Sequence, residues 1–276
     1  MDARTRVRHF LARGTADRAP FLVMATEYTA RLAQCSRGEL LADPGLFVRS
    51  YTESVAVLGL ETVLIEVPAP LGAPAATGRA VLRENLHRLR ATLRDQIAIV
   101  ALLPGPLTLA ASLGAPATPD CLDDLVTELI SLQEYLGPAE LDALALLERA
   151  AVADPDVPAL ADAVSAFWNV ARYYSLPSLL IAAQGTPRLA ETGPTAVAAW
   201  SGVTAADLLA AGATAAGQPA PSGEPAPSGR PASPGEPASP VPTPLPPGGF
   251  HLTADELPGD WPVDAVRSLI RQLSRS

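Results

Sequence analysis

Short apolar runs alternate along this chain with longer segments in which apolar residues recur every three or four positions. Buried parallel strands are continuous apolar runs of this length, and strands that alternate with helices are typical of βαβ units. The candidate strands, in chain order, are FLVMAT, TVLIEV, QIAIVALL, LDALALL, SLLIAA, TAVAAW and GGFHLT. The pattern predicts an α/β fold, a (βα)8 TIM-type barrel that is incomplete by one strand. A doubly wound open sheet is the alternative, although the chain lacks the GxGxxG turn that usually follows its first strand.

A segment rich in Pro, Ala, Ser and Gly interrupts this alternation at residues 217–248. Proline at this density removes backbone donors, and few apolar side chains are left to bury, so we predict a disordered linker. The main part of the barrel then covers residues 1–216, and its last strand and helix cover residues 249–276. Closure of the barrel predicts that the strand near Phe21–Thr26 lies beside the strand near Gly249–Thr253.

The charge pattern excludes several functions. The chain has no lysine, which removes Schiff-base and P-loop chemistry, and its formal net charge of -9 argues against nucleic-acid binding. Arginines gather in ARTRVRHFLARG and RENLHRLRATLR, which we expect to be solvated helix faces. Two distant cysteines, a charged amino terminus and the lack of long apolar runs predict a cytoplasmic protein without membrane segments.

Polar residues stand at the ends of several predicted strands, where a parallel barrel presents its pocket. The acids there are Glu27, Glu66, Glu148, Asp255 and Glu256, and the nearby cations are Arg31 and Arg149. Carboxylates at a pocket mouth favour general acid or base chemistry, especially when burial raises the pKa. We predict Glu148 as the first catalytic candidate, followed by Glu66 and Glu27. The predicted substrate-binding residues are Arg31, Arg149, Gln184, His251 and Asp255.

Three segments, in the same order, resemble motifs of the uroporphyrinogen decarboxylase superfamily, which also contains the corrinoid methyltransferases. The segments are the opening stretch from Arg6 to Glu66, the turn Pro104-Gly-Pro-Leu-Thr-Leu-Ala110, and the closing GGFHLTADELPGDWPVDAVRSLI. The resemblance implies a (βα)8 barrel and an activity in tetrapyrrole or one-carbon metabolism, with decarboxylation as the expected reaction.

The functional residues of this superfamily are replaced here. Where the decarboxylases carry arginines in a motif shaped like MRQAGR, this chain has Ala25 and Thr29 after Met24. The positions that correspond to the zinc ligands of the methyltransferases are Ala182, Gln184 and Asp255, which cannot form a zinc–sulfur site. A rim of acids would also repel a substrate with many carboxylates, since such a substrate needs guanidinium partners.

The sequence therefore predicts a uroporphyrinogen decarboxylase-like enzyme that acts on a small-molecule substrate without a metal or other cofactor. One alternative is a non-catalytic member that binds a small molecule or a protein partner. Another is a carboxylate-metal lyase or hydrolase on the same barrel, since carboxylates suit hard cations. We also predict no membrane or nucleic-acid partner, and a homodimer is possible.

Overall fold

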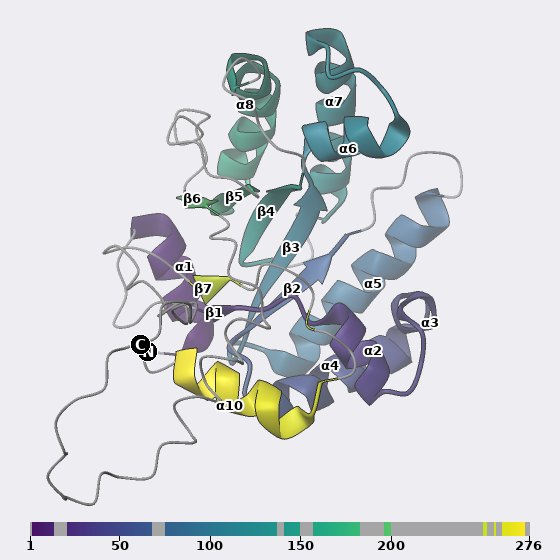
Figure 1. Cartoon of the computed structure of the whole chain (residues 1–276), viewed down its shortest axis with the longest axis vertical. Coiled ribbons are helices and arrows are strands. Elements are labelled where there is room, and N and C mark those ends of the chain that lie inside the picture. Colours follow the sequence, from purple (N-terminus) through teal and green to yellow (C-terminus); the bar gives the residue numbers. More distant parts are fainter. Residues whose placement is uncertain are drawn as a thin grey trace, which may run out of the picture.

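The structure is a computed structural model, and it is drawn as a ribbon in Figure 1. The residues that it describes are 2–13, 21–67, 75–136, 141–149, 157–182, 196–199, 251–252, 257 and 261–273. The predicted linker at 217–248 lies outside these residues. So do Gln184, Asp255 and Glu256.

All of the described strands pair in parallel. They are β1 (Phe21–Leu22), β2 (Thr62–Glu66), β3 (Ala98–Pro104), β4 (Ala143–Glu148), β5 (Ser178–Ala182), β6 (Ala196–Ala199) and β7 (His251–Leu252). Each lies within or at the edge of a predicted apolar run. Strands β2 to β6 form one sheet in chain order, and β1 pairs with β7.

The first and last described strands are neighbours, as the barrel prediction required. Phe21 pairs with His251 and Leu22 with Leu252, although these residues are more than two hundred positions apart. A parallel bridge between Met24 and Leu64 links this pair of strands to the larger sheet. The strand order is therefore β7-β1-β2-β3-β4-β5-β6, which is TIM-like. In the described part of the chain no ladder joins β6 to β7, so a closed barrel is not established.

Helices separate the strands from β1 to β5, and further helices precede β1 and follow β7. They are α1 (Ala3–Arg13), α2 (Thr26–Leu32), α3 (Arg37–Ala42), α4 (Pro44–Leu58), α5 (Ala75–Leu93), α6 (Pro106–Leu113), α7 (Pro119–Leu136), α8 (Val157–Tyr173) and α10 (Val263–Leu273). None of the described helices is long and apolar enough to span a membrane.

Helix α4 begins at Asp43-Pro44, a dipeptide that is typical of a helix start. Asp43 is the N-cap, and its carboxylate accepts hydrogen bonds from the backbone nitrogens of Gly45 (2.7 Å) and Leu46 (3.1 Å). Pro44 occupies the first turn, where a missing N–H costs nothing. Helix α3 begins one segment earlier with a capping box, in which the Ser36 and Glu39 side chains each accept from the other's backbone nitrogen.

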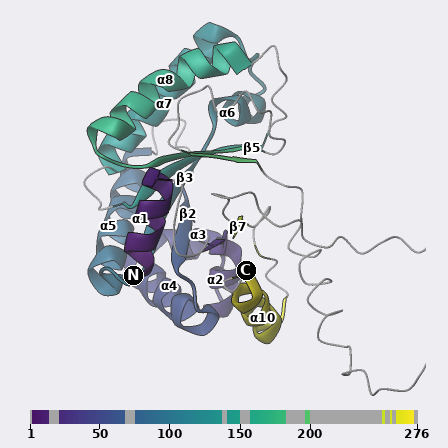
Figure 2. The same ribbon diagram turned by 90° about the vertical axis from the view of Figure 1, so that its left-hand side faces the viewer.

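The sheet separates two hydrophobic clusters. Its outer face packs against helices and includes Val63, Ile65, Leu144 and Leu146. Its inner face includes Leu64, Val100, Leu102, Ala143, Ala145 and Leu147, and Val7 and Phe10 of α1 join this set. Figure 2 shows α7 and α8 on one side of the strands and α1 on the other. Helix α1 therefore covers the inner face of the sheet.

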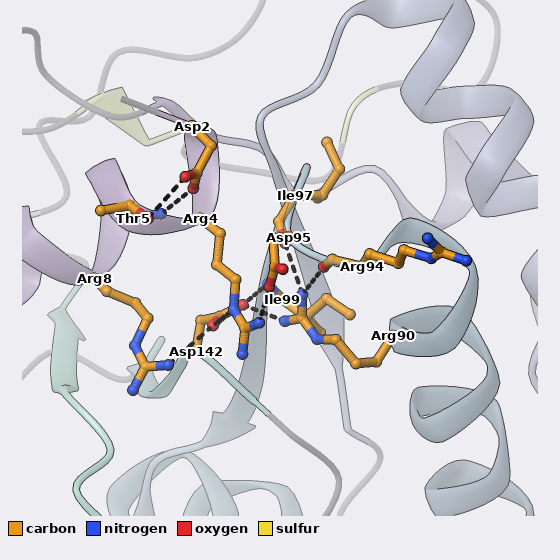
Figure 3. Close-up of polar contacts among 10 residues, drawn as sticks. All are labelled: Asp2, Arg4, Thr5, Arg8, Arg90, Arg94, Asp95, Ile97, Ile99 and Asp142. Carbon is orange, nitrogen blue, oxygen red and sulfur yellow. Dashed lines mark hydrogen bonds and ion pairs between the residues drawn. The ribbon is translucent and has the colours of Figure 1, made fainter.

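The arginine-rich segments are not merely solvated faces, which corrects our expectation. Arg90 of α5 is 4% exposed, and Arg6 of α1 donates to Glu61 at 2.9 Å. Arg4 and Arg90 both bind Asp142, a fully buried carboxylate just before β4 (Figure 3). Arginines from α1 and α5, which are far apart in the sequence, thus pair with the same buried acid, Asp142.

Candidate functional site

Glu148 is the last residue of β4, at the carboxyl end of the sheet, and its side chain is fully buried. Side chains alternate between the two faces of a strand. Because Ala145 and Leu147 face the interior cluster and Leu146 faces the helices, Glu148 leaves the strand on the helix-facing side. Its carboxylate therefore points away from the inner face of the sheet and toward α6.

The carboxylate of Glu148 caps the amino terminus of α6. It accepts hydrogen bonds from the backbone nitrogens of Leu107 (3.1 Å) and Thr108 (2.8 Å), and from the Thr108 hydroxyl (2.7 Å). The N-cap residue of α6 is Gly105, which has no side chain to cap the helix. A carboxylate from the neighbouring strand satisfies these donors instead, and a negative charge at this end of a helix is favourable.

Gly105 leaves the space that this carboxylate fills. A Cβ atom at position 105 would lie 2.2 Å from Cδ of Glu148 and 2.3 Å from Oε1. Contacts this short are not tolerated, so any larger residue would displace the carboxyl group. The glycine is required here by close approach, since its φ of -73° is open to any residue.

Burial raises the pKa of Glu148 to about 7, while hydrogen bonds from Thr108 and Leu107 act in the opposite direction. In its acid form, Glu148 can donate its proton to Thr108 Oγ1, which lies 2.7 Å from the carboxyl group. The Thr108 hydroxyl can then donate to the carbonyl oxygen of Leu147 at 3.3 Å. The raised pKa agrees with what we expected of a general acid or base. The catalytic role of Glu148 itself stays a prediction.

A second group of charges lies at the ends of β1 and β2. Arg37 of α3 contacts Glu66 at 2.8 Å and Glu27 of α2 at 3.6 Å. Since Leu64 faces the interior and Ile65 the helices, Glu66 belongs to the inner face. The side chains of Glu66 and Arg37 are 27% and 33% exposed, so a small molecule could reach both. We refer to Glu27, Arg37 and Glu66 as the mouth cluster.

Arg37 corrects the expectation of a rim whose nearby cations were Arg31 and Arg149. Arg37 compensates two of the predicted acids, and no pattern in the sequence points to it directly, since it lies in α3, whereas Glu27 lies in α2 and Glu66 ends β2. Arg31 instead donates to the carbonyl oxygen of Trp261 at 2.7 Å and lies over the Tyr28 ring. The exposed Arg149 donates its backbone nitrogen to Thr108 Oγ1 at 2.8 Å.

The structure therefore brings together some of the predicted site residues and separates others. Glu27 and Glu66 share Arg37, whereas Glu148 lies on the opposite face of the sheet beside Gly105 and Thr108. His251 lies in β7 opposite Phe21. Substrate binding by Arg31, Arg149, Gln184, His251 and Asp255 stays a prediction.

The sequence interpretation missed Thr108 as a partner of Glu148. A usable signal existed, because Thr108 belongs to the Pro104–Ala110 turn that carried the family resemblance. This turn follows the strand that pairs with β4, and neighbouring parallel strands place their carboxyl ends at the same edge.

Of the three positions that correspond to the zinc ligands of the methyltransferases in our sequence interpretation, only Ala182 lies within the described residues, where it ends β5. Among the residues that the structure describes, no group of three or more His, Cys, Asp and Glu side chains is placed to hold a metal ion.

Comparisons with known proteins establish the fold. No family model and no curated protein matches the sequence. Among solved structures, the chain is similar to a methyltransferase from Methanosarcina mazei, with a TM-score of 0.67 and 13% identity, covering 100% of this chain and 99% of that one. At this identity the likeness shows a shared fold alone.

Proposed function

We propose that this protein is an enzyme that acts on a small neutral or cationic molecule at the carboxyl end of its sheet, with Glu66 facing the substrate. The observation that carries the proposal is the partly exposed Glu66–Arg37 pair, which lies on the inner face where barrel enzymes bind their substrates. Arg37 fixes the orientation of the Glu66 carboxylate, and Glu27 completes the cluster.

The charge of the mouth cluster supports this class of substrate. Two carboxylates surround one guanidinium, which leaves Arg37 with little capacity for a further carboxylate. Two like charges roughly 6 Å apart repel by about 3 kcal/mol at an effective dielectric constant near 20. A substrate with many carboxylates, such as uroporphyrinogen, should therefore bind poorly and be turned over slowly or not at all.

The proposed reaction is a proton transfer assisted by Glu66, because a positioned carboxylate can perform this step without a cofactor. Glu148 would serve the site indirectly, by holding the Gly105–Thr108 turn at the same edge of the sheet. We include decarboxylation in the proposal only for a substrate that does not carry several further carboxylates.

The test begins with ligand-detected NMR on the purified full chain, using small-molecule sets matched for size and differing in charge. We expect neutral or cationic ligands to bind, and Glu66→Gln to weaken their binding about tenfold, as for one hydrogen bond to a charged group. Glu134→Gln is the matched control, since Glu134 is exposed on α7. Preferential binding of polycarboxylates, or an equal effect of both variants, would refute the proposal.

Turnover separates the enzyme from the alternative of a non-catalytic binding protein. Bound ligands are incubated with wild-type protein and Glu66→Gln, and products are followed by mass spectrometry. Uroporphyrinogen is included as a substrate that we expect to be poor. Loss of ligand binding in Glu66→Gln without turnover by the wild type would support the binding protein instead.

Thiol methyl transfer is a second candidate, favoured by the full-length likeness to a methyltransferase. The side chain of Ala182 argues against it, because the usual zinc–thiolate route needs a ligand there. We expect far less than one zinc per chain by elemental analysis after purification in zinc-containing medium. Stoichiometric zinc that is lost in Asp255→Ala would revive this candidate.

A further inference from the structure

A pocket of about 320 Å³ lies at the amino end of the sheet, on the side opposite the mouth cluster. It is lined by Arg4 of α1, His87, Arg90 and Ala91 of α5, and Arg94 and Asp95 of the turn that follows. The two arginine-rich segments of the sequence meet here. Nothing in the proposed function requires this pocket, and the inference below stands independently of it.

The pocket is built around a fixed, buried framework. Asp142 accepts hydrogen bonds from Arg4 Nε (2.6 Å), from the backbone nitrogen of Ile99 (2.9 Å) and from Arg90. Arg90 also donates to the carbonyl oxygens of Arg94 and Ile97. These bonds, drawn in Figure 3, hold the pocket wall rigid and occupy main-chain acceptors that would otherwise repel an anion.

The charges around the pocket leave a positive excess. Arg4, Arg90 and Arg94 line the pocket together with Asp95, and Arg8 lies 3.8 Å from Asp142 behind it. Asp2 instead faces its own helix, where it accepts from the backbone nitrogen and hydroxyl of Thr5. The site is therefore cationic within a chain whose formal net charge is -9.

Arg94 is the group best placed to bind a ligand. Its backbone is held in the left-handed region (φ 49°) by the turn, and its carbonyl oxygen is fixed by Arg90. Its guanidinium points away from Asp142 in Figure 3, and it forms no ion pair with the residues that the structure describes. Five donors of a planar guanidinium thus remain for an anion.

We propose that this pocket binds a phosphate group, either inorganic or on a small organic molecule. Phosphate carries nearly two negative charges at neutral pH, which matches the excess of the three lining arginines over Asp95, since Arg8 helps to balance Asp142. Arginine recognises phosphate oxygens through paired hydrogen bonds. The volume is at the lower end of ligand pockets, which suits a small phosphorylated compound.

The test is isothermal titration of the full chain with inorganic pyrophosphate and with glycerol phosphate, in chloride buffer of constant ionic strength. We expect saturable binding, weakened about tenfold by Arg94→Gln, since one charged hydrogen-bonding pair is lost. Preference for one titrant separates an inorganic from an organic ligand. No saturable binding of either would overturn the proposal.

Two further variants distinguish the pocket from general attraction of anions. Arg88→Gln removes an exposed arginine of α5 that lies outside this pocket. It should change the affinity less than twofold. Asp95→Asn removes the exposed acid that faces Arg4, and it should tighten binding. Equal weakening by Arg88→Gln and Arg94→Gln, or weaker binding in Asp95→Asn, would contradict the assignment. The ring signals of His87 should also shift during titration, and those of His9 and His251 should not.

Discussion

The two ends of β4 each hold a fully buried acid, and the two acids are satisfied in opposite ways. Asp142 precedes the strand and binds the guanidinium groups of Arg4 and Arg90. Glu148 ends the strand, and the hydrogen bonds described for its carboxylate come from peptide nitrogens and the Thr108 hydroxyl. One acid is balanced by full charges and the other by dipoles. Dipoles offset less of the desolvation cost, and the pKa of Glu148 rises to about 7.

Asp142→Asn should give the largest loss of stability. The amide would place a donor against a guanidinium, and buried positive charge would lose its counter-ion, which costs about 3–5 kcal/mol. Chemical denaturation measures the effect. Asp95→Asn is the control, because Asp95 also pairs with Arg4 but is 76% exposed, and it should cost less than about 1 kcal/mol. Equal losses in the two variants would mean that the guanidinium pairs of Asp142 contribute nothing beyond a surface pair.

Glu148 should make stability depend on pH in a way that Glu148→Gln abolishes. The folded-state pKa of about 7 lies above the ordinary value of 4.5, so the folded protein holds this proton more tightly. This contribution is complete below pH 4.5 and is lost as pH rises through 7, by roughly 3 kcal/mol in total. The stability advantage of wild type over the variant should therefore shrink with rising pH. An advantage that is constant with pH would rule out the raised pKa.

Gly105→Ala should cost about 1–3 kcal/mol, as overpacking of a dense interior does. The new methyl group would lie 2.2 Å from Glu148 Cδ and would push the carboxylate off the α6 terminus. A double-mutant cycle with Glu148→Ala, measured by urea denaturation, tests this cause. If Gly105→Ala lowers the stability as much in the Glu148→Ala background as in the wild type, close approach to the Glu148 carboxylate is not the reason for the glycine.

Thr108→Val should have the smallest effect on stability, about 1 kcal/mol for a net hydrogen bond. Loss of the Thr108 side-chain hydrogen bond should raise the pKa of Glu148 further, because that bond lowers it. The carboxyl carbon signal of Glu148 in NMR reports the titration. Thr127→Val, at an exposed position of α7, should leave that signal unchanged. A lower pKa in Thr108→Val would reverse our account of how the acid is held.

Much of the architecture was predictable. The apolar runs located all of the described strands, because a strand buried on both faces tolerates few polar residues. The Asp43-Pro44 signal located the start of α4, since capping depends on local chemistry alone. The pairing of β1 with β7 followed from the closure that a barrel requires.

The candidate site was only partly predictable. The sequence identified Glu66 and Glu27 as acids at strand ends, but not Arg37 between them, because α3 approaches the sheet through tertiary packing. The expected solvated arginines were drawn inward by Asp142, whose burial no local pattern revealed.

The sequence by itself determined the order and type of the elements, the acidity of the strand ends and the absence of lysine chemistry. Only the tertiary structure decided which way each acid points. The segment ALALL between the two acids is apolar on both faces, so it carries no sign of which alternate residues face inward. The packing of the neighbouring helices decides which residues face inward. It places Glu148 on the helix-facing side of the sheet and Glu66 on the inner face.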